Sequence, residues 1–375
     1  MEPSSPLTNN LFDHLKPEHF LDQLQESNKQ NFNQLFKCSH NKNSYSLKVF
    51  IEDHPFTKTQ ILDHIKILET IRFIEPKPSS MPKYHGYFIE NKKIYLVFEL
   101  FKQAVNEYLA DNKKNLDNPN ARAFNDGTED FYNTIFTGYF YSLIEGLVFL
   151  QTMNVSHLHI NPENVLLNKD DDLKIIDFGL IKGLSDLMRL QNEKYEPKIN
   201  YMAPEVLELV TAGKILCIAN PYKADLFSAS LILLETLSTG PRKEGTSEKD
   251  LQKEIINRID EINDIYGDLT IFPYYNYSYR NLMLESLPKC LEIKVNERSD
   301  FLEIFKKYAE IIKKPMTNKL LKKPKIFLDL KKKQLIYSLE EKVVKWEENE
   351  NLKTAFENQK DEMKKMEKEN KLGKI

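Results

Sequence analysis

Glycine is scarce in this sequence, with 11 residues in 375, which is less than half of the ~7% typical of soluble proteins. Few glycines are therefore available for a glycine-rich loop that packs its backbone against a phosphate group. Cysteine is also rare, and Cys38, Cys217 and Cys290 form neither a close pair nor an even framework. This spacing excludes a disulfide scaffold and favours a reducing compartment, so we expect a cytoplasmic protein.

Long hydrophobic runs are missing as well. No stretch approaches the ~18 apolar residues that cross a bilayer, and the polar N-terminal sequence does not have the pattern of a signal peptide. A net charge of -3, from 53 basic and 56 acidic residues, gives no overall attraction for nucleic acid. A hydrophobic content of 41% is ample for a sizeable buried core. We therefore expect a globular protein with neither a nucleic-acid partner nor a transmembrane segment.

The first hundred residues are predicted to form short strands around one helix. The runs of apolar, aromatic and β-branched residues typical of strands are 33–38, 45–51, 84–89 and 94–99. Thr57 and Gln60 form a capping box directly before an apolar stripe that begins at Ile61. This pattern predicts a helix that ends before Pro76.

After residue 100 the apolar periodicity becomes helical. It predicts a long buried helix from Ile135 to Leu150, an apolar helix over Ala224–Leu237, and two more helices within 281–312. A polar loop is expected over 111–130. The sequence thus predicts an α+β fold, with a small β-rich lobe followed by a larger, mainly helical lobe.

The chain is expected to divide into three parts. These are a loose lead-in over 1–18, a folded domain over 19–312 with its lobes at 19–100 and 101–312, and a Lys/Glu-rich extension over 313–375. Lysines dominate 319–333, which we interpret as a solvated linker, with contact to an acidic membrane surface as the alternative. Residues 335–372 favour a charged helix that packs one apolar stripe on the body, because a phase break interrupts the spacing of a coiled coil.

Three short motifs occur in a fixed order behind the long apolar helix. They are P-E-N at 162–164, D-F-G at 177–179 and A-P-E at 203–205. In this order they resemble the protein kinase superfamily, and the resemblance covers about residues 20–312. It implies a protein-kinase-like bilobal fold, with ATP and Mg²⁺ at a site that transfers phosphoryl groups to protein hydroxyls.

The resemblance also implies roles for individual residues. Asn164 and Asp177 would offer hard oxygen ligands to Mg²⁺. The residues implied around the nucleotide are Lys48, Phe98, Glu99, Phe101, Leu35, Ser46 and Leu166. The residues implied to join the lobes or hold the site are His64, Leu68, His157, Phe178, Glu205, Asp225 and Arg298. Among these, Arg298 is expected to pair with Glu205.

The catalytic motif departs from the family at its centre. His159 stands where the family has an aspartate that accepts the proton of the substrate hydroxyl. An imidazole has no negative charge, and it becomes cationic when it accepts a proton. Asn161 replaces a lysine that stabilises the transferred phosphoryl group, and Lys198 stands at the place of a threonine near both. We therefore expect no intact catalytic group.

Two further family features are missing. Asn28, Gln30 and Asn33 occupy the places of the glycine-rich loop, where their side chains obstruct close approach of the backbone to phosphates. Leu158 replaces the arginine that would receive a phosphorylated activation loop.

The partner of Lys48 also changes. His64 is aligned with the helix glutamate that pairs with this lysine in the family, so Asp63 or Asp177 has to take over.

These departures favour a pseudokinase that acts as a scaffold or allosteric partner, with only weak binding of ATP and Mg²⁺. Its partners would be proteins, for example an active kinase. The alternative is a divergent active Ser/Thr kinase that uses Asp177, Asn164 and Lys48 with His159 as an unusual base.

Overall fold

The computed structural model describes the greater part of one compact unit, Leu15–Lys322. The described residues are 34–40, 43–51, 54–74, 77–90, 92–105, 107–108, 138–192, 199–213, 218, 220–237, 248–267 and 285–312. A second unit joins Met1–His14 to Lys323–Ile375, and none of its residues is among the described ones. The predicted lead-in over 1–18, the polar loop over 111–130 and the extension over 313–375 thus lie outside the described residues. The predicted domain boundaries stay predictions.

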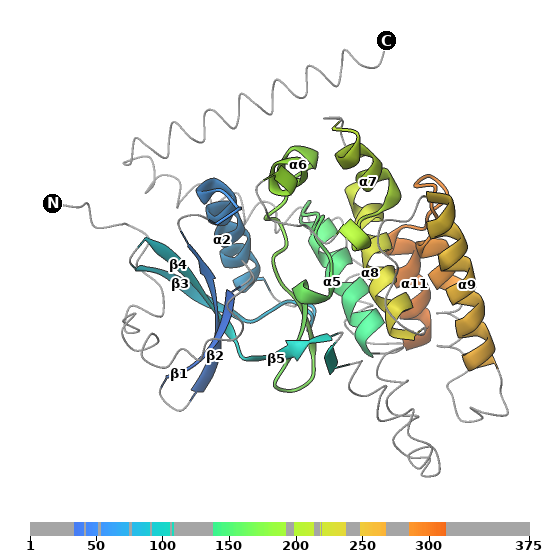
Figure 1. Cartoon of the computed structure of the whole chain (residues 1–375). Coiled ribbons are helices and arrows are strands. Elements are labelled where there is room, and N and C mark those ends of the chain that lie inside the picture. Colours follow the sequence, from blue (N-terminus) through green and yellow to red (C-terminus); the bar gives the residue numbers. More distant parts are fainter. Residues whose placement is uncertain are drawn as a thin grey trace. The chain divides into compact units, whose positions relative to one another are not determined.

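The first lobe is built on a four-stranded antiparallel sheet (Figure 1). Its strands are β1 (Gln34–His40), β2 (Asn43–Phe50), β3 (Tyr84–Glu90) and β4 (Lys93–Glu99), in the order β1-β2-β4-β3. The four predicted strands are confirmed. The helix α2 (Lys58–Arg72) lies between β2 and β3 in the chain. Its predicted capping box forms, since Thr57 Oγ1 accepts from the main-chain N–H of Gln60 at 3.3 Å.

The second lobe is mainly helical, which confirms the bilobal α+β fold. Its small sheet has the order β5-β6-β7, from β5 (Phe101–Ala104), β6 (Val165–Asn168) and β7 (Leu173–Ile175). Its helices are α5 (Phe140–Thr152), α6 (Leu184–Asn192), α7 (Pro204–Thr211), α8 (Pro221–Leu237), α9 (Glu248–Gly267) and α11 (Phe301–Ile312), with short 3-10 turns η2 (Pro162–Asn164) and η3 (Ile199–Tyr201). The helices expected near 135–150 and over 224–237 are confirmed, and so are the two expected within 281–312, which are the helical residues 285–290 and α11.

Three helices, α6, α7 and α9, were not expected from the sequence. In α9 the buried residues Leu251, Ile255, Arg258 and Ile262 follow a helical spacing. Because Arg258 interrupts this buried face, the apolar spacing is not evident in the sequence. In the short α6 the spacing spans only nine residues.

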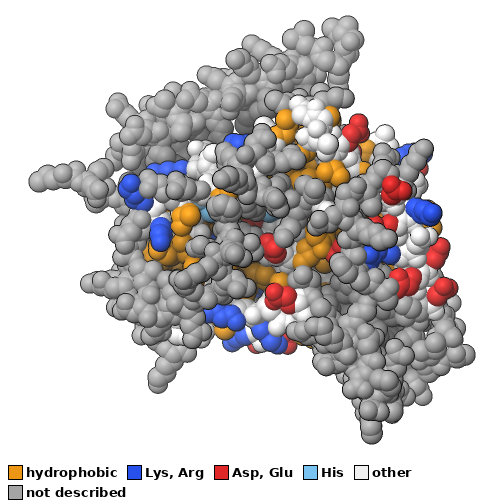
Figure 2. All heavy atoms as spheres, viewed as in Figure 1, with side chains coloured by type: hydrophobic (Ala, Val, Ile, Leu, Met, Phe, Trp, Pro, Cys, Tyr) orange, Lys and Arg blue, Asp and Glu red, His pale blue; other side chains and the backbone are white. Residues whose placement is uncertain are grey.

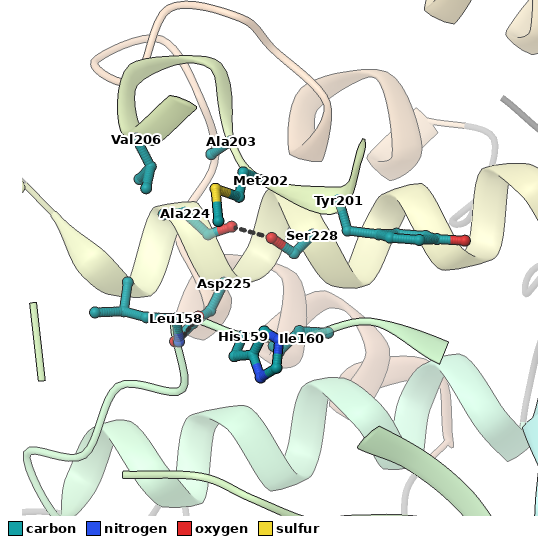
Figure 3. Close-up of a pocket in the computed structure, with 10 residues that line it drawn as sticks. All are labelled: Leu158, His159, Ile160, Tyr201, Met202, Ala203, Val206, Ala224, Asp225 and Ser228. Atoms are coloured by element: carbon teal, nitrogen blue, oxygen red, sulfur yellow. Dashed lines mark hydrogen bonds between the residues drawn. The ribbon is translucent and has the colours of Figure 1, made fainter. Parts of the chain in front are cut away.

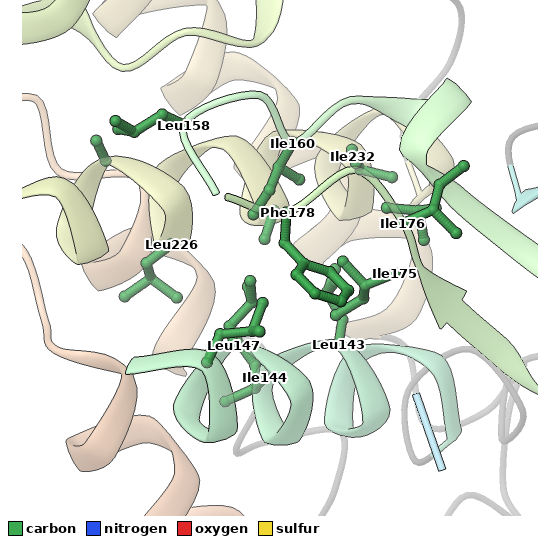
Figure 4. Close-up of a cluster of buried hydrophobic side chains, with 14 of the residues drawn as sticks. Leu143, Ile144, Leu147, Leu158, Ile160, Ile175, Ile176, Phe178, Leu226 and Ile232 are labelled. Atoms are coloured by element: carbon green, nitrogen blue, oxygen red, sulfur yellow. The ribbon is translucent and has the colours of Figure 1, made fainter. Parts of the chain in front are cut away.

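A continuous hydrophobic core connects the two lobes. The ring of Phe178 lies above Leu143 and Leu147 of α5 and beside Ile175, as Figure 4 shows. Phe178 is 0% exposed, and burying a side chain of this size contributes about 1.5–3 kcal/mol of transfer free energy. Leu68 and Tyr84 of the first lobe belong to the same cluster. The core therefore fixes the segment that carries the D-F-G motif.

The surface of the described part is strongly charged around α9. Figure 2 shows acidic side chains on the side of the molecule where α9 lies, and Asp250, Asp260 and Asp264 of this helix are exposed. No helix in the described ranges has the length and apolar character that crossing a bilayer requires.

Candidate active site

Lys48 and Asp177 meet between the two lobes. Lys48 is on β2 and Asp177 follows β7, and their ammonium and carboxylate groups form an ion pair in which each side chain is 2% exposed. Burial raises the pKa of Asp177, but the adjacent ammonium of Lys48 outweighs it and holds this pKa below its usual value. Of the two partners expected for Lys48, the structure thus places Asp177. Asp63 instead pairs with Lys66 at 2.8 Å and with Lys182.

His64 lies on α2 with no exposed surface and faces the D-F-G segment. Its Nδ1 is 2.8 Å from the carbonyl oxygen of Phe178, so Nδ1 is the atom that carries the hydrogen. The two rings pack edge to face, with centroids 5.7 Å apart. Burial lowers the pKa of His64 to about 4, so the ring is neutral at physiological pH. A neutral ring here cannot replace the carboxylate that the family uses to hold Lys48.

Asp225 of α8 supports the loop that carries the catalytic motif. Its Oδ2 accepts from the main-chain N–H of His157 at 2.7 Å, and its Oδ1 accepts from that of Leu158 at 2.6 Å. Leu158 has a φ of 56°, a left-handed conformation that is costly for a leucine. The two bonds to Asp225 fix that conformation. Burial raises the pKa of Asp225 to about 7.

His157 links the same loop to the D-F-G segment. Its Nε2 donates to the carbonyl oxygen of Ile176 at 2.9 Å, directly before Asp177. Burial lowers the pKa of His157 to about 4, so the ring stays neutral in this position.

Asn164 fixes the ring of His159. The amide nitrogen of Asn164 lies 2.8 Å from the carbonyl oxygen of His159 and 3.1 Å from His159 Nδ1. A carbonyl oxygen only accepts, so the atom of Asn164 that faces it is the nitrogen, and Nδ1 accepts the second bond. In the neutral ring the hydrogen is then on Nε2. Neither ring nitrogen offers a lone pair to the proton of an incoming hydroxyl.

Asn161 is also held within the loop. Its Nδ2 donates to the carbonyl oxygen of His159 at 3.0 Å, and its Oδ1 accepts from the main-chain N–H of Glu163 at 2.9 Å. Asn161 is 1% exposed and caps the short helix η2. The side chain therefore serves the loop itself and offers no charge to a phosphoryl group.

Two buried oxygen atoms at this site fit a divalent cation. Asn164 Oδ1 and Asp177 Oδ1 have no hydrogen-bond partner, although both are buried. Amide and carboxylate oxygens are the ligands that Mg²⁺ prefers, and Mg²⁺ keeps several water ligands of its own. No cluster of three or more His, Cys, Asp or Glu side chains in the described ranges could hold a metal ion. Asn164 and Asp177 would thus hold Mg²⁺ with one protein oxygen each, and water would complete its coordination.

The residues expected around the base of a nucleotide lie where the two lobes join. Phe98 of β4 and Phe101 of β5 are each 2% exposed, with ring centroids 5.8 Å apart. Leu166 of β6 is 6% exposed, and Leu35 of β1 packs partly buried against the core. These apolar side chains form a closely packed region.

Glu99 fixes the connection between the lobes. Its Oε1 accepts from the main-chain N–H of Lys83 at 2.8 Å, and its Oε2 accepts from Asn168 Nδ2 of β6 at 2.9 Å. Lys174 of β7 lies 3.4 Å from Glu99 Oε1. Glu99 therefore binds the main chain of the first lobe and two side chains of the second.

The segment after the D-F-G motif is attached to α2. Gln60 Nε2 donates to the carbonyl oxygen of Leu180 at 3.0 Å, and Arg189 of α6 donates to Gln60 Oε1 at 2.6 Å. Lys182 pairs with Asp63. The sequence did not predict these contacts. The spacing of Leu184, Leu187 and Leu190, all buried, is the signal that could have located α6.

Arg298 and Glu205 form a two-pronged ion pair. Nη1 and Nη2 of Arg298 lie 2.8 and 2.9 Å from the two carboxylate oxygens of Glu205. The side chain of Arg298 is 0% exposed and packs on Phe227, with its guanidinium carbon 4.7 Å from the ring centroid. This pair attaches the A-P-E motif to the loop before α11.

A small pocket lies beside the catalytic loop. Figure 3 shows its lining from three segments, the loop residues 158–160, the residues 201–206 and the start of α8. Ser228 donates to the carbonyl oxygen of Ala224 at 3.1 Å in its wall. Leu158 gives this pocket an apolar side chain where the family has an arginine. Asn28, Gln30, Asn33 and Lys198 lie outside the described residues.

A β-rich lobe, a helical lobe and a D-F-G segment packed between them define the class of two-lobed phosphotransferase folds. A family model described as the protein kinase domain matches residues 31–308. The chain belongs to the protein kinase domain family.

Among curated proteins, mitogen-activated protein kinase 15 of Oryza sativa subsp. japonica is 29% identical over 222 residues, which cover 58% of this chain and 38% of that protein. Mitogen-activated protein kinase 9 of Arabidopsis thaliana is 28% identical over 220 residues, covering 57% of this chain and 37% of that protein. Calcium-dependent protein kinase 4 of Plasmodium falciparum (isolate 3D7) is 25% identical over 288 residues, covering 72% and 45%. The chain thus spans less than half the length of these relatives.

Proposed function

We propose that this protein is a pseudokinase, a protein-kinase domain that does not transfer phosphoryl groups efficiently and acts through its shape. The observation that carries the proposal is the bond from the Asn164 amide to His159 Nδ1 at 3.1 Å. This bond occupies the lone pair that a histidine base would need. Asn161 adds no cationic stabilisation, because its amide is bonded within the loop.

The supporting contacts need neither nucleotide nor phosphate. His64 holds the carbonyl of Phe178, Gln60 holds that of Leu180, and Arg298 holds Glu205. A fixed arrangement of the two lobes and of the segment that carries the D-F-G motif suits a scaffold or an allosteric partner of another protein, including an active kinase. ATP and Mg²⁺ bind weakly in this proposal, since Lys48 already pairs with Asp177.

The experiment is a phosphotransfer assay with radiolabelled γ-phosphate, Mg²⁺ and a general protein substrate. We expect no label above background in the wild type and the same result for Asp177→Asn. Label that appears in the wild type and is abolished by Asp177→Asn would overturn the proposal.

A divergent active Ser/Thr kinase is the second candidate. It is favoured by the buried, unpartnered oxygens of Asn164 and Asp177, which suit a divalent cation. For this candidate the His159–Asn164 bond has to break when substrate binds. The second candidate predicts transfer that falls when Asn164→Ala removes that oxygen.

A further inference from the structure

The main-chain N–H of Phe101 donates to the hydroxyl oxygen of Ser46 at 2.8 Å. Ser46 lies on β2, two residues before Lys48, and pairs in register with Phe98 of β4. Phe101 is the first residue of β5. Ser46 is 0% exposed and Phe101 2%, so water does not compete for this bond. Both residues are among those that the family resemblance places against a nucleotide.

The bond uses a donor that a purine would otherwise need. A purine ring presents nitrogen acceptors along its edge, and a buried main-chain N–H is the kind of group that pairs with such an acceptor. The N–H of Phe101 has one hydrogen, and that hydrogen is given to Ser46. The hydroxyl oxygen of Ser46 therefore stands in for the nitrogen of a base.

The neighbouring residues keep the Phe101 N–H in this orientation. The main-chain N–H of Glu99 donates to the carbonyl oxygen of Lys83 at 2.9 Å, and the Glu99 side chain is bonded on both sides of the connection. The ring of Phe98 packs on Tyr84, with centroids 5.5 Å apart. The strand connection is thus fixed before and at the residue that would meet a base.

We propose that Ser46 is a specificity-determining residue that closes the purine site by occupying the N–H of Phe101. A purine binds only when this bond breaks, which lowers its affinity. The inference deepens the proposed pseudokinase function, since it concerns the same nucleotide site, but it involves no phosphate chemistry. It adds the side chain of Ser46 to the Lys48–Asp177 pair as a second cause of weak nucleotide binding.

Adenosine is the probe that separates this inference from the proposed function, because it has no phosphate to transfer. Its dissociation constant is measured by calorimetry for the wild type, Ser46→Ala and Ser44→Ala. Ser44 is the matched control, because it lies on the same strand with its Oγ exposed and 3.4 Å from Ser39 Oγ. We expect Ser46→Ala to bind adenosine roughly tenfold to a hundredfold more tightly, since an unpaired buried N–H favours any ligand that supplies an acceptor. Ser44→Ala should match the wild type.

If Ser46→Ala does not fold, a second measurement on the wild type still tests the proposal. Hydrogen exchange at the Phe101 amide of the wild type should be slow without ligand, because the N–H is buried and bonded. Fast exchange there, or equal adenosine affinities of the wild type and Ser46→Ala, would show the proposal to be wrong. Neither result bears on the pseudokinase proposal, which the phosphotransfer assay tests. Phosphotransfer by the wild type would overturn that proposal and would not bear on the role of Ser46.

Discussion

The ammonium group of Lys48 reaches from β2 of the first lobe to the carboxylate of Asp177 beyond β7, where each side chain is 2% exposed. Removing one partner of a buried pair leaves the other charge without compensation. Lys48→Met is therefore expected to lower the free energy of unfolding by about 3–5 kcal/mol. Chemical denaturation monitored by circular dichroism measures this change.

The matched control is the double variant Lys48→Met/Asp177→Asn. It removes both charges, and asparagine tolerates the left-handed φ of 65° at this position, so it should be more stable than Lys48→Met alone. Equal stability of the single and double variants would contradict the view that the unpaired carboxylate causes the loss.

Much of the fold and part of the site could be predicted from the sequence. Strand and helix periodicity gave the two lobes, because each element buries one face against the core. The resemblance of the P-E-N, D-F-G and A-P-E motifs to the kinase family located Asn164, Asp177 and Glu205. Short motifs can be recognised from local sequence, although Asp225 and Arg298 hold two of their loops from distant segments.

Contacts between distant residues could not be predicted in the same way. The bond between Ser46 and Phe101 joins positions 55 residues apart, and that between Gln60 and Leu180 joins positions 120 apart. A serine on a buried strand is usually a small packing residue, and nothing in its neighbours shows where its hydroxyl points. The tautomer of His159 likewise depends on Asn164, whose orientation only the tertiary structure gives.

The pair between Arg298 and Glu205 provides a second stability test. Glu205→Gln keeps the size of the side chain but leaves the fully buried guanidinium without its countercharge. We expect a loss of about 3–5 kcal/mol in the free energy of unfolding, measured by denaturant titration. Glu297→Gln is the control, because its pair with Lys294 is exposed and should change stability by no measurable amount. Equal losses for the two variants would contradict the prediction.

Asp225 makes stability depend on pH. Its pKa is about 7 in the folded protein against an ordinary value of 3.8, so between these values the folded state keeps a proton that the unfolded chain has lost. The contribution of Asp225 to stability therefore falls as pH rises from about 4 to about 7. Asp225→Asn loses an acceptor for the N–H groups of His157 and Leu158, which costs about 1–3 kcal/mol at low pH.

The gap in unfolding free energy between the wild type and Asp225→Asn should thus narrow as pH rises from about 4 to about 7. Urea denaturation at a series of pH values measures it. A gap that stays constant over this range would show that the carboxyl group does not titrate there.

Gln60 holds the segment that follows the D-F-G motif. Gln60→Leu keeps the size of the side chain but removes the donor to the Leu180 carbonyl and the acceptor for Arg189. We expect main-chain amides in 180–190 to exchange roughly tenfold faster, because the segment opens more easily when these bonds are lost. Hydrogen exchange with mass spectrometry measures the change. Gln60 also belongs to the capping box of α2, so Thr57→Ala is the control that removes the cap and leaves Gln60 in contact with Leu180. If Thr57→Ala accelerates amide exchange in 180–190 as much as Gln60→Leu does, the capping box holds the segment, and the bonds of Gln60 to Leu180 and Arg189 do not.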